Sequence, residues 1–102
     1  MSGLDNTSFT VRTTAATTDT LTQTDSVVIY TATTAKTCNL ISAALLQPGR
    51  RYVVINTGAG AITVDPAASE TINGAATLAV TASTGRADFV SDGANWFTVT
   101  SS

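Results

Sequence analysis

The sequence predicts an all-β protein, a single small antiparallel β-sandwich or barrel of jelly-roll-like type with about eight short strands. An open sandwich and a small β-solenoid are the alternatives, because they use the same short alternating strands and glycine turns. Threonine makes up about a fifth of the 102 residues, and its branched Cβ fits a strand better than a helix. Apolar runs of strand length recur between glycine, proline, Asn-Gly and Asp-Gly turns. With 43% hydrophobic and 12% charged residues, the chain has enough apolar material for one core, and we expect one domain.

The first part of the chain predicts an N-terminal strand and a threonine-rich arm at residues 1–24, followed by the β-sandwich body at residues 25–102. Residues 9–13 alternate apolar and polar side chains, as a strand does. Residues 14–24 have almost no apolar spacing, so they favour an extended arm that a neighbouring subunit orders. The alternative is an irregular loop that packs on its own domain. The residues expected to make the arm's contacts are Phe9, Val11, Arg12 and Leu21.

The body begins with two strands and a short turn. Residues 26–30 are almost continuously apolar, which indicates a strand covered on both faces, and residues 37–41 form the next strand. Residues 42–47 have helix-forming composition but are too few for a stable helix, so they predict one helical turn or a loop. Pro48 and Gly49 then form a turn.

The clearest β pattern lies at residues 51–65. Two β-branched, apolar runs at residues 52–55 and 61–64 flank a joint at residues 56–60 whose residues tolerate positive φ angles. This pattern predicts a β-hairpin. Downstream, three further strands are expected at residues 76–81, 86–91 and 95–100, separated by turns at Asn73-Gly74, Gly85 and Asp92-Gly93.

The first strand of this hairpin is apolar on both faces. Tyr52 and Val54 share one face, and Val53 and Ile55 share the other, because side chains alternate along a strand. A small protein has one core for one of these faces. We therefore expect the other face to pack on an opposing sheet or another subunit, and we assign Val53 and Ile55 to an oligomer interface.

The charge pattern argues against several classes of partner. The net charge is -2 and the five basic residues are spread along the chain, so neither nucleic acid nor an anionic membrane is an expected partner. The N-terminus lacks the features of a signal peptide, and no apolar stretch has membrane-spanning length. We expect the protein to be made and kept in a cytoplasm until it is released.

No residue pattern indicates an enzyme, a cofactor or a metal site. Cys38 has no histidine to act as its base and no second cysteine, so it is expected to be a buried small side chain. Carboxylate pairs are available for hydrolysis or calcium binding, but the turn positions of most of them, and an expected solvent-facing Asp88, favour structural roles. The candidate acids are Asp65, Glu70, Asp88 and Asp92.

Sugar binding needs exposed aromatic side chains. Trp96, Tyr30 and Tyr52 would stack on sugar rings if they lay on the surface, but each is expected in the core. A fully buried Trp96 would count against a carbohydrate site.

Four segments carry a family resemblance: RYVVINTG at residues 51–58, AITVDP at 61–66, ETINGAATL at 70–78 and VSDGANWF at 90–97. They resemble a β-rich module of tailed-bacteriophage virion proteins, which occurs in tail fibres, in tail-tip proteins and as small stand-alone head proteins. The resemblance covers roughly residues 25–100. It implies a structural virion component without enzymatic activity or a small-molecule substrate, and often a trimer.

The layout of the chain helps to choose among these components. One module with a short arm, beginning at Met1, is expected to be a complete gene product, which favours a capsid decoration (cement) protein on the outer surface of the head. Its expected partner is the major capsid protein, and it is expected to be a homotrimer. The alternative is a tail-fibre or tail-tip protein that binds host carbohydrate. Arg50 and Arg51 are candidate capsid contacts, although solvated turn charges would also explain them.

Overall fold

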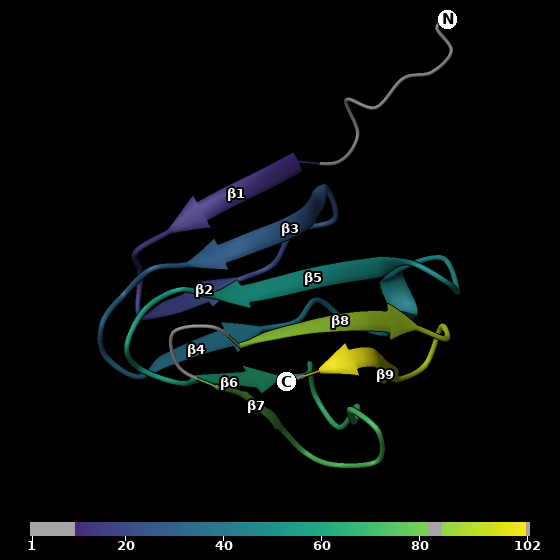
Figure 1. Cartoon of the computed structure of the whole chain (residues 1–102). Coiled ribbons are helices and arrows are strands. Elements are labelled where there is room, and N and C mark those ends of the chain that lie inside the picture. Colours follow the sequence, from purple (N-terminus) through teal and green to yellow (C-terminus); the bar gives the residue numbers. More distant parts are fainter. Residues whose placement is uncertain (1–9, 82–84, 102) are drawn as a thin grey trace, which may run out of the picture.

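The computed structural model describes residues 10–81 and 85–101, and this part of the chain forms nine strands in two facing sheets (Figure 1). Sheet A has the order β1 (Thr10–Thr14), β3 (Asp25–Tyr30), β5 (Arg51–Asn56), β8 (Arg86–Ser91) and β9 (Trp96–Ser101). Sheet B has the order β2 (Thr18–Thr20), β4 (Lys36–Asn39), β6 (Ile62–Asp65) and β7 (Leu78–Val80). The all-β prediction is confirmed.

The first six strands alternate between the two sheets, so the chain winds as in a β-solenoid. β1, β3 and β5 are parallel neighbours in sheet A, and β2, β4 and β6 are parallel neighbours in sheet B. The other three pairs, β5–β8, β6–β7 and β8–β9, are antiparallel. The prediction of an antiparallel body was therefore wrong for four of seven strand pairs, and the jelly-roll-like arrangement is not confirmed. Period-two alternation is the same in both kinds of pairing, so it does not reveal strand direction.

The predicted hairpin at residues 52–64 is also wrong, because β5 and β6 lie in different sheets. The segment at residues 57–61 is a corner that carries the chain across the sandwich, and it stacks on the preceding corner at residues 31–35. A Cβ on Gly58 would lie 1.9 Å from the carbonyl oxygen of Ala32. Glycine is thus required here for close backbone approach, and not for a positive φ angle.

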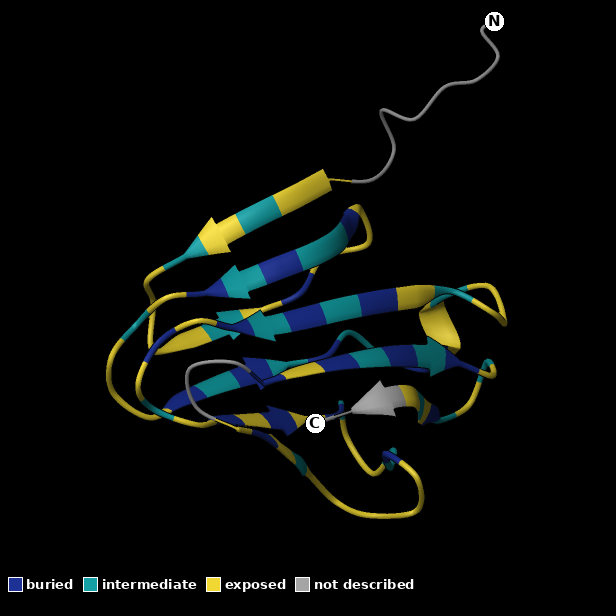
Figure 2. Cartoon of the chain, in the orientation of Figure 1, coloured by how far each residue is buried: buried dark blue, intermediate teal, exposed yellow. Residues whose placement is uncertain are grey.

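The core lies between the sheets, and buried residues alternate with more exposed ones along the strands (Figure 2). Its largest fully buried side chains are Trp96, Tyr30, Tyr52 and Phe89. The rings of Tyr52 and Trp96 pack with centroids 5.7 Å apart. The predicted burial of Cys38 is confirmed. The predicted helical turn is a short 3₁₀ turn, η1 (Ala43–Leu45), capped by Ser42.

Residues 10–24 belong to the body and do not form the predicted arm. β1 pairs with β3, β2 pairs with β4, and Leu21 is 2% exposed in the core. The structure thus places no boundary between residues 24 and 25. Residues 1–9 lie outside the described part of the chain, so the predicted contact of Phe9 is not addressed.

Candidate functional site

The two outer faces of the sandwich differ in chemistry. The outer face of sheet B is polar and carries Thr18, Thr20, Thr37, Asn39, Thr63 and Asp65. The outer face of sheet A carries a group of apolar side chains that we call the apolar face: Val11, Val27, Ile29, Val53, Ile55, Val90 and Phe97. A contiguous apolar surface on one side of a small protein is a typical interaction site.

Strand register brings the apolar face together. Val11, Val27 and Val53 are Cα partners in one row across three strands, and Ile29 and Ile55 are partners in the next row. In a third row, Arg51, Val90 and Phe97 are partners across β5, β8 and β9. Val11 is 69% exposed and Phe97 is 43% exposed, so both are open to a partner. The sequence predicted Val53 and Ile55 on such a surface but not their neighbours on the other strands.

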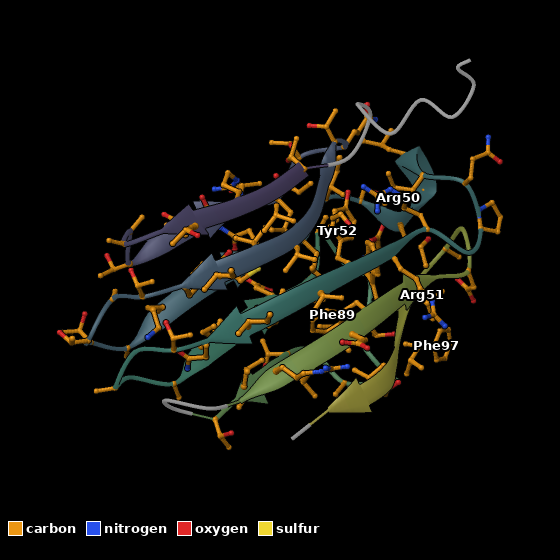
Figure 3. The ribbon with its side chains drawn as sticks, turned by 45° about the horizontal axis from the view of Figure 1, so that its top comes forward. Arg50, Arg51, Tyr52, Phe89 and Phe97 are labelled. Carbon is orange, nitrogen blue, oxygen red and sulfur yellow. The ribbon has the colours of Figure 1, made fainter. Side chains whose placement is uncertain are left out.

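The two arginines predicted as capsid contacts point to different places (Figure 3). The Arg50 guanidinium lies over the Tyr52 ring, 4.3 Å from its centroid, and donates to the carbonyl oxygens of Gln23 and Asp25. Arg50 therefore holds the backbone at Gln23 and Asp25 close to the buried ring of Tyr52. Arg51 is exposed in the same row as Phe97, with Val90 between them, and its guanidinium has no hydrogen bond or ion pair within residues 10–81 and 85–101.

Two further charges lie on the outer side of sheet A. Arg86 and Asp88 form an ion pair at 3.0 Å. The Asp88 side chain points outward from sheet A, as predicted, but only 14% of it is exposed to solvent. One of its oxygens, Oδ1, is buried without a hydrogen-bond partner in the described structure.

The predicted arm residues Val11, Arg12 and Leu21 are separated by the fold. Val11 lies on the apolar face, and Leu21 is in the core. Arg12 points between the sheets, where it forms a bidentate pair with Asp19 at 2.8 and 2.9 Å and a second pair with Asp25 at 2.9 Å. These residues close the end of the core at β1 and β2 with charge in place of apolar side chains. The contact with Asp19 crosses between the sheets, and the contact with Asp25 joins the neighbouring strands β1 and β3. Neither contact leaves a periodic pattern in the sequence, so Asp19 and Asp25 were not predicted.

The pKa of Asp25 responds to this arrangement. Burial acts to raise the pKa of its carboxyl, but hydrogen bonds from Arg12 and Thr22 outweigh it, and the pKa lies below the ordinary value. The same contacts raise the pKa of Arg12. The charged pair thus stabilises the fold while both groups are ionised.

We expect this contribution to be lost in acid. Because the folded-state pKa of Asp25 is lower than the unfolded one, the stabilisation is complete above about pH 4 and disappears as the pH falls through the folded-state value. Urea midpoints measured from neutral pH to about pH 2 should fall less steeply for Arg12→Gln than for the wild type. Arg86→Gln, which removes the more exposed pair, is the control. Equal acid slopes in Arg12→Gln and wild type would refute the assignment.

The remaining candidate residues have structural surroundings. Burial raises the pKa of Cys38 to about 12, so the thiol is protonated at neutral pH and is a poor nucleophile. Tyr30, Tyr52 and Trp96 are fully buried. The sugar-stacking role considered for these three aromatic residues is therefore contradicted. In the described part of the chain, Phe97 is the one exposed aromatic side chain.

The acidic residues do not converge. Glu70 accepts hydrogen bonds from Ser42 Oγ and the Ala43 N–H, and it fixes η1. Asp92 accepts from the Ala94 and Asn95 N–H groups in the β8–β9 turn, while Asp65 lies on the other outer face. Within the residues described, no group of three His, Cys, Asp or Glu side chains suits a metal ion, and no pocket is found. No helix in that region is long and apolar enough to cross a membrane.

Comparison with known proteins adds no family. No protein-family model matches this chain, and no match was found among curated proteins. On structural grounds the apolar face is the strongest candidate site.

Proposed function

We propose that this protein is a non-enzymatic bacteriophage virion protein that binds the outer surface of the head and stabilises it as a capsid decoration protein. The observation that carries the proposal is the apolar face, which is set on one side of a sandwich whose opposite side is polar. A surface of this kind suits binding to another protein surface. That the partner is the surface of a phage head is inferred from a resemblance to phage virion modules, carried by residues 51–58, 61–66, 70–78 and 90–97.

The proposal includes the homotrimer that the resemblance implies, with the major capsid protein as the partner. Val53 and Ile55, assigned to the trimer, share one face with Arg51, assigned to the capsid. Five strands at about 4.8 Å spacing and about 17 Å length make this face about 400 Å². A standard interface covers about 800 Å² on each partner, so the face is too small to serve both contacts.

A tail-fibre or tail-tip protein is the alternative. The buried Trp96, Tyr30 and Tyr52 weigh against its carbohydrate-binding form. A tail protein would therefore have to bind its partner by a contact other than the stacking of these aromatic rings on sugars.

Binding to heads tests the proposal. Expanded heads that lack this protein should be mixed with the purified chain and examined by cryo-EM and by survival of the shells on heating. We expect ordered density at three-fold or quasi-three-fold positions and greater heat resistance. Density on tails, with none on heads, would support the alternative instead.

A further inference from the structure

We propose that the apolar face is the capsid-binding surface, and that it docks on an aliphatic patch of the shell bearing a carboxylate that pairs with Arg51. This inference rests on the proposed function and names the chemistry of the partner. It assigns the trimer contact to another part of the surface.

The apolar part of the argument comes from shape and residue type. Six of the seven side chains on the apolar face are valine or isoleucine, in rows that span up to three adjacent strands. Such side chains form the flat, ridged surface by which sheets pack on other apolar surfaces. Phe97 and Val11, at the two edge strands, are the most exposed and extend the surface across the whole sheet.

The charge on this surface defines the partner further. Arg86 and Asp88 already pair with each other, whereas Arg51 has no partner within the described residues. Covering the Val90 and Phe97 row would take the Arg51 guanidinium out of water. An uncompensated buried charge is costly, so the covering surface must supply an anion. A carboxylate matches the forked geometry of arginine.

The same argument disfavours a second copy as the occupant of this face. Arg51, Arg86 and Asp88 give it a net charge of +1, so two such faces would meet with like charge. The acid on the face, Asp88, is 14% exposed and bound to Arg86, so it is poorly placed to accept from a second Arg51. A different, acidic surface complements the face better.

The small area of the face indicates how binding becomes tight. A contact of about 400 Å² on one partner falls below the size of a stable interface, so one copy should bind weakly. A trimer that presents three such faces to three neighbouring shell subunits converts weak contacts into strong attachment through high effective concentration. A symmetric shell provides those repeated sites.

The test measures binding to expanded heads that lack this protein, with three variants. Arg51→Gln should weaken binding about tenfold or more and flatten its dependence on salt, because a charge-assisted pair is lost. Val53→Ser should weaken binding about fivefold to tenfold and leave the salt dependence unchanged, because it removes apolar contact. Thr63→Glu, at an outward position on the polar face of sheet B, should bind as the wild type does.

The outcomes separate this inference from the proposed function. Wild-type binding that Arg51→Gln and Val53→Ser leave intact would overturn the inference but keep the decoration role. No binding of the wild type to heads would overturn the proposed function and this partner with it. The oligomeric state of each variant is measured by sedimentation. If Arg51→Gln or Val53→Ser dissociates an oligomer that the wild type forms, a second copy covers the apolar face and the inference is overturned. Since Arg51 is exposed, its variant should fold normally, and circular dichroism checks this.

Discussion

Replacing Gly58 by alanine should lower the free energy of unfolding by about 3 kcal/mol or more, one of the largest effects expected for a single substitution in this chain. The added Cβ would lie 1.9 Å from the carbonyl oxygen of Ala32 and 2.8 Å from its carbonyl carbon. Both atoms are backbone, so no side-chain rotation can relieve the overlap. The corner at residues 57–61 would have to separate from the corner at 31–35, and the ladder of parallel strands behind it would be disturbed. Urea unfolding, followed by tryptophan fluorescence, measures the loss.

Gly74→Ala is the matched control for this prediction. A Cβ on Gly74 would meet no atom within 4 Å, but the φ angle of +84° is unfavourable for alanine. Its cost should therefore be only about 1 kcal/mol, the usual penalty for a left-handed residue with a side chain. A Gly58→Ala variant no less stable than Gly74→Ala would mean that the corners are not stacked as described.

The position of Gly58 also explains why the sequence predicted a hairpin between β5 and β6, which lie in different sheets. An Asn-Thr-Gly-Ala-Gly segment between two apolar runs is compatible with a hairpin and with a corner that crosses to the opposite sheet. The deciding contact, Gly58 against Ala32, joins residues that are far apart in the chain. Asn56 belongs to the same corner: it is fully buried, donates to the carbonyls of Gly60 and Thr81, and accepts from the Gly58 N–H. The bonds from Asn56 to Gly58 and Gly60 are local and suit either kind of turn, whereas the contacts with Thr81 and Ala32, which fix the crossing, have no local signal.

Strand positions were more accessible to sequence reasoning than strand partners were. The runs at residues 26–30, 52–55 and 86–91 depend on local composition, and each lies within a strand of the structure. The prediction that Val53 and Ile55 lie on the opposite face of their strand from Tyr52 and Val54 follows from alternation alone, and it is confirmed. Their assignment to an oligomer interface stays a prediction. Which residues join them on the apolar face depends on register, so Val90 and Phe97 were not identified. The partner of this face stays a prediction.

The N-terminal segment shows a different limit of pattern reading. Residues 14–24 contain one large apolar side chain, Leu21, and this sparse pattern suggested an arm. In the structure β1 and β2 form the first winding of the chain between the two sheets. The space inside this winding is occupied by the ion pairs of Arg12 with Asp19 and Asp25. A terminal turn of a repetitive β structure needs a polar cap, because no further turn covers its core. Low apolar content is therefore what a capping turn requires.

Deleting residues 1–24 should consequently abolish cooperative unfolding. The deletion removes β1, β2 and buried Leu21, and it turns β3 and β4 into uncovered edges. The side chain of Asp25, 3% exposed, would lose Arg12, and the Tyr30 hydroxyl would lose Asp19. Unpartnered buried polar groups and lost core contacts each cost several kcal/mol, which together approach the whole stability of a small domain.

Trp96 provides the readout for this deletion, because it lies on β9, at the opposite edge of sheet A from β1. Its fluorescence should change over a broad range of urea in the truncated chain, with a reduced m-value, whereas the full chain should show one sharp transition. Arg12→Gln, which keeps both strands, should shift the midpoint but preserve the sharp transition. A truncated chain that unfolds cooperatively at the wild-type midpoint would mean that residues 10–24 are dispensable to the body.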